Sequence, residues 1–161
     1  MEFASFIAEF GAQHGMGDLA LDENGAVGFD VDGHPMILQQ HDGTGCVIAT
    51  LDLIDAPDAD AASVNRLLMQ ANLALFSLDG LALGLHPEKN RYQLLGRFDV
   101  AAMDFIGFDA ALGRMLERAE QWRTFLGNFF AVAAAEADAA APDGASAPPP
   151  EDDPLASMMR V

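Results

Sequence analysis

The chain has 161 residues, of which 51% are hydrophobic and 20% are charged, a composition that supports one packed domain. Its 25 acidic residues against 8 basic ones give a formal net charge of −17, which makes nucleic acid and anionic membrane surfaces unsuitable partners. The single lysine, Lys89, follows a glutamate, which excludes a phosphate-binding P-loop. The single cysteine, Cys46, excludes an internal disulfide and thiolate metal clusters. With no basic leader and no apolar run long enough to insert into a membrane, the sequence indicates a soluble, cytoplasmic protein.

A first helix is predicted over residues 2–13. Its apolar side chains recur at the spacing i, i+3, i+4 and i+7, which places them on one face; they are Phe3, Phe6, Ile7 and Phe10. The glycines from Gly11 to Gly17 are expected to end this helix.

Three strands are expected next, over residues 27–31, 36–41 and 46–53. Turn sequences separate them: Asp32-Gly33 lies between the first two, and residues 42–45, which contain two glycines, lie between the second and third. Short connections of this kind predict an antiparallel meander.

A second helix is predicted to run from Pro57 and Asp58 to about Leu78. Apolar side chains surround it. One side carries Val64, Leu67, Leu68, Ala71, Leu75 and Leu78, and the other carries Met69, Leu73 and Phe76. A helix that is apolar nearly all round is buried on both sides. Two interpretations remain open: the second side faces another subunit, or the helix lies in the centre of a monomer core.

Two further strands, over residues 81–85 and 91–98, and a long helix from about 104 to 134 complete the domain. The helix carries apolar residues at a 4-3-4-3 spacing, namely Phe108, Leu112, Met115, Ala119, Trp122, Leu126 and Phe129. Arg114, Arg118 and Arg123 are placed on or beside its outer face. The order α-β-β-β-α-β-β-α predicts an α+β fold with a twisted antiparallel sheet.

The composition changes near the end of the chain. From residue 133 onward it is mostly alanine, proline and acidic residues, which cannot bury enough apolar surface to offset the entropy of ordering. We therefore expect a domain over residues 1–135 and a disordered tail over residues 136–161.

No catalytic or metal-binding constellation is found in the sequence. His34 and His41 lie near the ends of the second strand, but turn and strand-end histidines are usually solvated. The segment that starts at Asp30 resembles a calcium loop but has Pro35 where the loop needs glycine. We expect no enzyme activity, no metal and no cofactor. The 11 Phe and 8 Met residues indicate a binding module instead.

The pattern resembles the class I effector chaperones of bacterial type III secretion, the Tir chaperone-like family. The matching stretches are residues 67–72 (Leu-Leu-Met-Gln-Ala-Asn), 80–87, 19–25 and Trp122-Arg123, within a resemblance that covers about residues 1–132. Two features depart from the family pattern. His86 stands where an acidic residue is common, and the tail has no family counterpart.

The resemblance implies a cytoplasmic homodimer that holds the N-terminal segment of a secreted effector in extended form, soluble and ready for export. It also raises the export ATPase as a partner. The implied dimer residues are Leu68, Asn72, Leu73, Phe76, Leu81, Leu83 and Leu85. The implied effector-binding residues are Phe3, Phe6, Phe10, Val27, Phe29, Ile37 and Leu38. Two alternatives remain: a regulatory interaction module that acts through its acidic tail, and a small ligand-binding α+β domain.

Overall fold

The computed structural model describes residues 2–31, 33–41, 45–57 and 61–140. By compactness the chain divides into two units, Met1–Phe130 and Ala131–Val161. The first unit holds the sheet and the core. The second unit is described over residues 131–140, which are helical. Most of the predicted tail, from residue 141, lies outside the described residues, as do parts of the predicted turns and the predicted start of the second helix.

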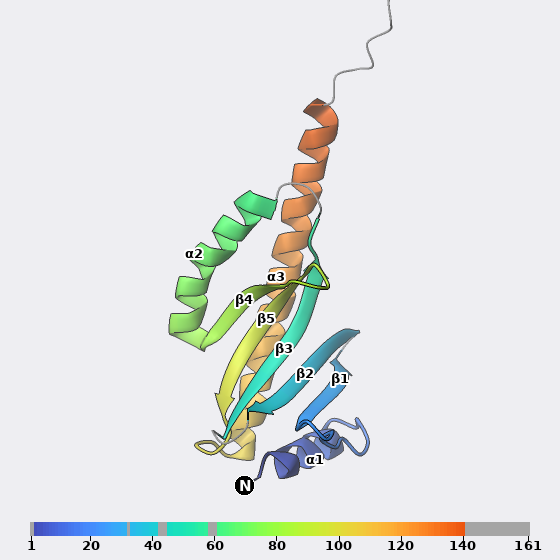
Figure 1. Cartoon of the computed structure of the whole chain (residues 1–161), viewed down its shortest axis with the longest axis vertical. Coiled ribbons are helices and arrows are strands. Elements are labelled where there is room, and N and C mark those ends of the chain that lie inside the picture. Colours follow the sequence, from blue (N-terminus) through green and yellow to red (C-terminus); the bar gives the residue numbers. More distant parts are fainter. Residues whose placement is uncertain (1, 32, 42–44, 58–60, 141–161) are drawn as a thin grey trace, which may run out of the picture. The chain divides into compact units, whose positions relative to one another are not determined.

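The predicted order of elements and the α+β fold class are confirmed (Figure 1). The elements are α1 (Phe3–Gln13), β1 (Ala26–Val31), β2 (His34–His41), β3 (Cys46–Asp55), α2 (Ala61–Asp79), β4 (Leu81–His86), β5 (Arg91–Asp99) and α3 (Phe105–Ala140). Helix α3 ends six residues later than expected, because the alanines that follow position 134 are strong helix formers.

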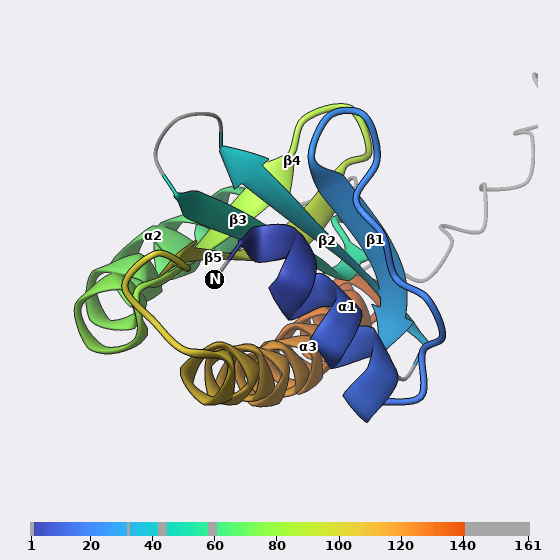
Figure 2. The ribbon, with the colours of Figure 1, turned by 90° about the horizontal axis from the view of Figure 1, so that it is seen from below.

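The five strands form one antiparallel sheet in the order β1-β2-β3-β5-β4. The first three strands make the predicted meander, and Val31 pairs with His34 across the first turn. Strand β5 lies between β3 and β4, so that β1 and β4 are the two edges. Figure 2 shows α1 and α3 on the same face of the sheet.

That face carries the core. Along β2, Met36 and Leu38 are buried while Ile37 between them is exposed, which is the period-2 alternation of a strand with one covered face. The predicted α1 stripe meets the start of α3, where the rings of Phe6 and Phe108 lie 5.4 Å apart. Burial of each such side chain contributes about 1.5–3 kcal/mol to folding.

Gly11 does not end α1, as predicted, but lies inside it and is buried. A Cβ atom at this position would come within 2.6 Å of the main-chain oxygen of Gly17. The glycine therefore allows the loop after α1 to fold back against the helix, and the main-chain N–H of Met16 donates a hydrogen bond to Gly11 O at 2.9 Å.

The position predicted for Arg123, on or beside the outer face of the last helix, is wrong. Its side chain is only 10% exposed. The guanidinium group turns toward β3, where Nη2 donates a hydrogen bond to the main-chain oxygen of Asp52 at 2.6 Å. Burial lowers the pKa of Arg123, an effect that Glu120 opposes.

Candidate functional site

The outward side of α2 is the largest apolar feature that the described surface presents. Met69, Leu73 and Phe76 lie at helical spacing and are 73%, 77% and 71% exposed. On the opposite side, Val64, Leu68 and Leu75 are buried in the core. Of the two interpretations of this helix, a central position in a monomer core is therefore wrong. Exposed apolar side chains in a contiguous stripe mark an interaction site.

Leu85, near the end of β4, adds an exposed apolar side chain at the sheet edge beside this helix. Of the seven residues implied for a dimer interface, Leu73, Phe76 and Leu85 are exposed and Asn72 is half-buried. The other three, Leu68, Leu81 and Leu83, are buried inside the chain.

Asn72 connects α2 to β4. Its side-chain Oδ1 accepts a hydrogen bond from the main-chain N–H of Leu83 at 2.7 Å, and its Nδ2 donates one to Leu83 O at 3.0 Å. Both polar groups of one edge residue are therefore bonded by a single side chain.

A groove of about 380 Å³ lies between α2 and α3. Its walls are mostly apolar and include Leu75 and Leu78 from α2 and Trp122 and Phe125 from α3. At its rim, Arg118 Nε lies 3.0 Å from Asp79 Oδ2, an ion pair between the two helices. Sequence reasoning did not find this groove, because α2 and α3 are separated by two strands in the chain and their approach depends on the tertiary fold.

The seven residues implied for effector binding fall into two groups. Ile37 is 45% exposed on the sheet face opposite the core. Phe29 is partly buried and packs against the core. The other five are buried, with exposed fractions of 6% or less; they are Phe3, Phe6, Phe10, Val27 and Leu38. In this structure a partner could contact those five only after the packing around them had changed.

Ile37 lies in a second hollow, of about 470 Å³, on the outer face of the sheet. Thr50, Lys89 and Arg91 also line it, together with Pro35 and Asp52. The sequence did not reveal this group, although the register that places Arg91 opposite Asp55 brings its members together.

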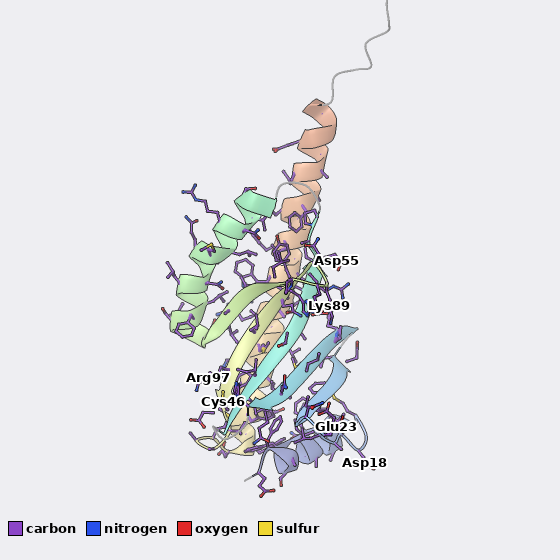
Figure 3. All side chains as sticks on the ribbon, viewed as in Figure 1. Asp18, Glu23, Cys46, Asp55, Lys89 and Arg97 are labelled. Atoms are coloured by element: carbon purple, nitrogen blue, oxygen red, sulfur yellow. The ribbon has the colours of Figure 1, made fainter. Side chains whose placement is uncertain are left out.

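Charge at this hollow is organised around Arg91. Its Nε donates a hydrogen bond to Asp55 Oδ1 at 2.6 Å, and its Nη1 lies 3.4 Å from Asp52 Oδ2 (Figure 3 labels Asp55 and Lys89). The hydrogen bond and the charge of Arg91 hold the pKa of Asp55 below its ordinary value, and Asp55 in turn raises the pKa of Arg91. The pairs secure the place where β3 bulges against β5, between Asp52 and Asp55.

Among the described residues, no group of three or more His, Cys, Asp or Glu side chains is placed to hold a metal ion. A separate inspection of the helices described over residues 3–140 finds none with the length and apolarity to cross a membrane.

The sequence matches the model of the Tir chaperone protein (CesT) family over residues 5–123. The chain belongs to this family, and it is a chaperone of the type III secretion class. No curated protein sequence matches it.

Solved structures share the fold. The chain is similar to a chain in the crystal structure of the ExsC–ExsE complex, with a TM-score of 0.68 and 24% identity over 77% of this chain and 96% of that one. A chain of the HopA1–SchA chaperone–effector complex matches with a TM-score of 0.63 and 16% identity, over 74% and 91% of the two chains. For the Yersinia pestis type III secretion chaperone SycH, in complex with a stable fragment of YscM2, the TM-score is 0.57 and the identity 14%, over 73% and 97%.

Proposed function

We propose that the chain is a homodimeric cytoplasmic chaperone that binds the N-terminal segment of a secreted effector and keeps it extended, soluble and ready for export. Family membership supports the chaperone activity. The solved structures with the same fold include a chaperone–effector complex, HopA1–SchA. The observation that carries the proposal is the exposed stripe of Met69, Leu73 and Phe76, which a chain acting alone would leave in water.

The stripe on α2 is the proposed contact between the two copies. Each of the three side chains is more than 70% exposed, so pairing two such helices removes a large apolar area from water. A two-fold axis makes such a patch self-complementary. Leu85 extends the contact to the edge strand, and the buried Leu68, Leu81 and Leu83 support it from inside each copy.

The effector segment is proposed to lie along β1 and across the outer face of β2. Strand β1 has a partner strand on one side only, so its other side can form main-chain hydrogen bonds with an added strand. Ile37 and the hollow around it offer an apolar contact for an alternate side chain of that segment. The buried residues Phe3, Phe6 and Phe10 fix the position of α1 in this proposal.

Binding alone accounts for this activity, with no reaction performed on the client. The segment must be ordered along the surface, which costs conformational entropy, and the apolar contacts and strand hydrogen bonds offset that cost. We further propose that the loaded dimer delivers the effector to the export ATPase.

The test is affinity capture from a bacterium that expresses its export system, followed by limited proteolysis and mass spectrometry of the bound proteins. We expect a secreted protein that is protected from protease only in its N-terminal segment. Capture without any secreted protein, or protection of a whole folded domain, would overturn the proposal. Removal of residues 141–161 should leave this capture intact; loss of the client on that truncation would instead support action through the acidic tail.

A further inference from the structure

Strand β4 is an edge of the sheet with β5 on one side only. Along an antiparallel pair, residues alternate between those whose backbone groups bond to the neighbouring strand and those whose groups point away from it. Leu83, which pairs in register with Leu94, belongs to the second kind, because its N–H and C=O both bond to Asn72. An unpaired edge of this kind is a template for another strand.

Asn72 occupies the middle of that template. Leu83 is the third of the six residues of β4. The amide of Asn72 presents to it one acceptor and one donor, at 2.7 Å and 3.0 Å, as the peptide groups of a neighbouring strand would. A strand that added to β4 would need the same two groups of Leu83 and would have to displace this side chain.

The opposite edge differs. Strand β1 pairs with β2 alone, and Gly28 in its middle is exposed. A bond from the rest of the chain reaches its first residue, where Asp22 N–H donates to Ala26 O at 2.7 Å. The central part of β1 thus presents the surface that Asn72 covers on β4.

We propose that Asn72 closes the β4 edge to incoming strands and so determines that an extended partner segment adds at β1. The direction of the partner to β1 rests on the proposed function, whereas the closure of β4 is a property of the chain by itself. Asn72 acts here through Leu83 and is a positioning residue.

The test uses the full-length chain labelled with ¹⁵N and two nitroxide-labelled peptides. One peptide copies residues 34–41, the neighbour of β1, and the other copies residues 91–99, the neighbour of β4. In the unaltered chain we expect paramagnetic broadening at the amides of residues 26–31 and none at residues 81–86. In Asn72→Ala we expect the Leu83 amide to exchange with solvent roughly tenfold faster or more, and broadening by the 91–99 peptide to appear at residues 81–86.

Asn65→Ala is the matched control, because Asn65 also lies on α2 but its Oδ1 accepts a hydrogen bond from the Tyr92 hydroxyl, at 3.2 Å, and does not touch the β4 backbone. It should leave both edges unchanged. If Asn72→Ala does not fold, Asn72→Asp replaces it, since aspartate keeps the acceptor for Leu83 N–H and loses the donor to Leu83 O. Broadening at β4 in the unaltered chain would overturn the proposal. So would a variant in which Leu83 stays protected, or exchanges rapidly while neither peptide reaches β4. Client capture plays no part in this test, so its outcome is separate from that of the proposed function.

Discussion

Arg123 and Asp52 are separated by 71 positions in the chain, yet Arg123 Nη2 lies 2.6 Å from the main-chain oxygen of Asp52. The contact joins α3 to β3 at the point where the register of β3 against β5 shifts. Nε of the same guanidinium has no hydrogen-bond partner in the described structure. A buried cation is thus held mainly by one carbonyl group and by Glu120, 3.6 Å from Nη1.

Arg123→Met should destabilise the domain. The substitution keeps an apolar stem but removes the donor to Asp52 O, so that a carbonyl at the bulge loses its partner. Such a loss costs about 1–3 kcal/mol. Urea unfolding followed by circular dichroism measures it. Arg114→Met, an exposed position on the same helix, is the control and should change stability little; equal effects from the two variants would contradict the role of the contact.

Phe6→Ala should lower the free energy of unfolding by about 3–5 kcal/mol, because the side chain is fully buried against Phe105 and Phe108. Under conditions where the variant is still folded, client binding should be retained. Thermal unfolding together with a binding titration separates the two effects. A variant with normal stability that no longer binds would show that Phe6 contacts the effector directly.

Much of the fold follows from local patterns in the sequence. The spacing of Phe3, Phe6, Ile7 and Phe10 defines α1 wherever its partner lies, and the alternation along β2 defines that strand. What the patterns do not contain is the surroundings. The same spacing is expected whether Phe6 faces a core or an effector, and the apolar circumference of α2 allowed both a subunit contact and a central position. The burial of Arg123 and the pairing of Asn72 with Leu83 depend on contacts between distant segments, for which the sequence carries no periodic signal.

Asp55→Asn should weaken the domain near neutral pH and have little effect in acid. The pKa of Asp55 is lowered in the folded state, chiefly by the hydrogen bond from Arg91. The folded state thus favours the charged form, and the stabilisation is present above the unfolded pKa of about 3.9. It is lost as pH falls through the lower folded value. The pair is exposed, so the effect is small and decreases with salt.

Urea unfolding of both proteins at pH 7 and below pH 3, at low and high ionic strength, tests this. The difference in stability between the unaltered chain and Asp55→Asn should be present at pH 7 in low salt and shrink under the other conditions. A difference that grows on acidification would contradict the assignment.

Ile37→Asp should weaken effector binding and leave self-association unchanged. The side chain lies on the outer face of β2, where it lines the hollow that also contains Thr50 and Arg91. A carboxylate there loses an apolar contact and must be desolvated when the segment binds, so we expect a loss of tenfold or more in affinity. Gln39→Asp, an exposed position two residues along the same strand face, adds the same charge without removing an apolar side chain. Equal losses from both variants would show that charge, and not the apolar contact, controls binding.

The homodimer that holds an effector is tested most directly by native mass spectrometry of the complex captured from the bacterium. Purification of the unaltered chain and of a Leu73→Asp Phe76→Asp variant, which places charges on the α2 stripe, gives the comparison, with Ile106→Asp as a control at another exposed apolar position. The account predicts two copies of the chain with a secreted protein for the unaltered chain and for Ile106→Asp, and single copies for the α2 variant. A client-bound single copy of the unaltered chain, or an α2 variant that still pairs, would contradict it.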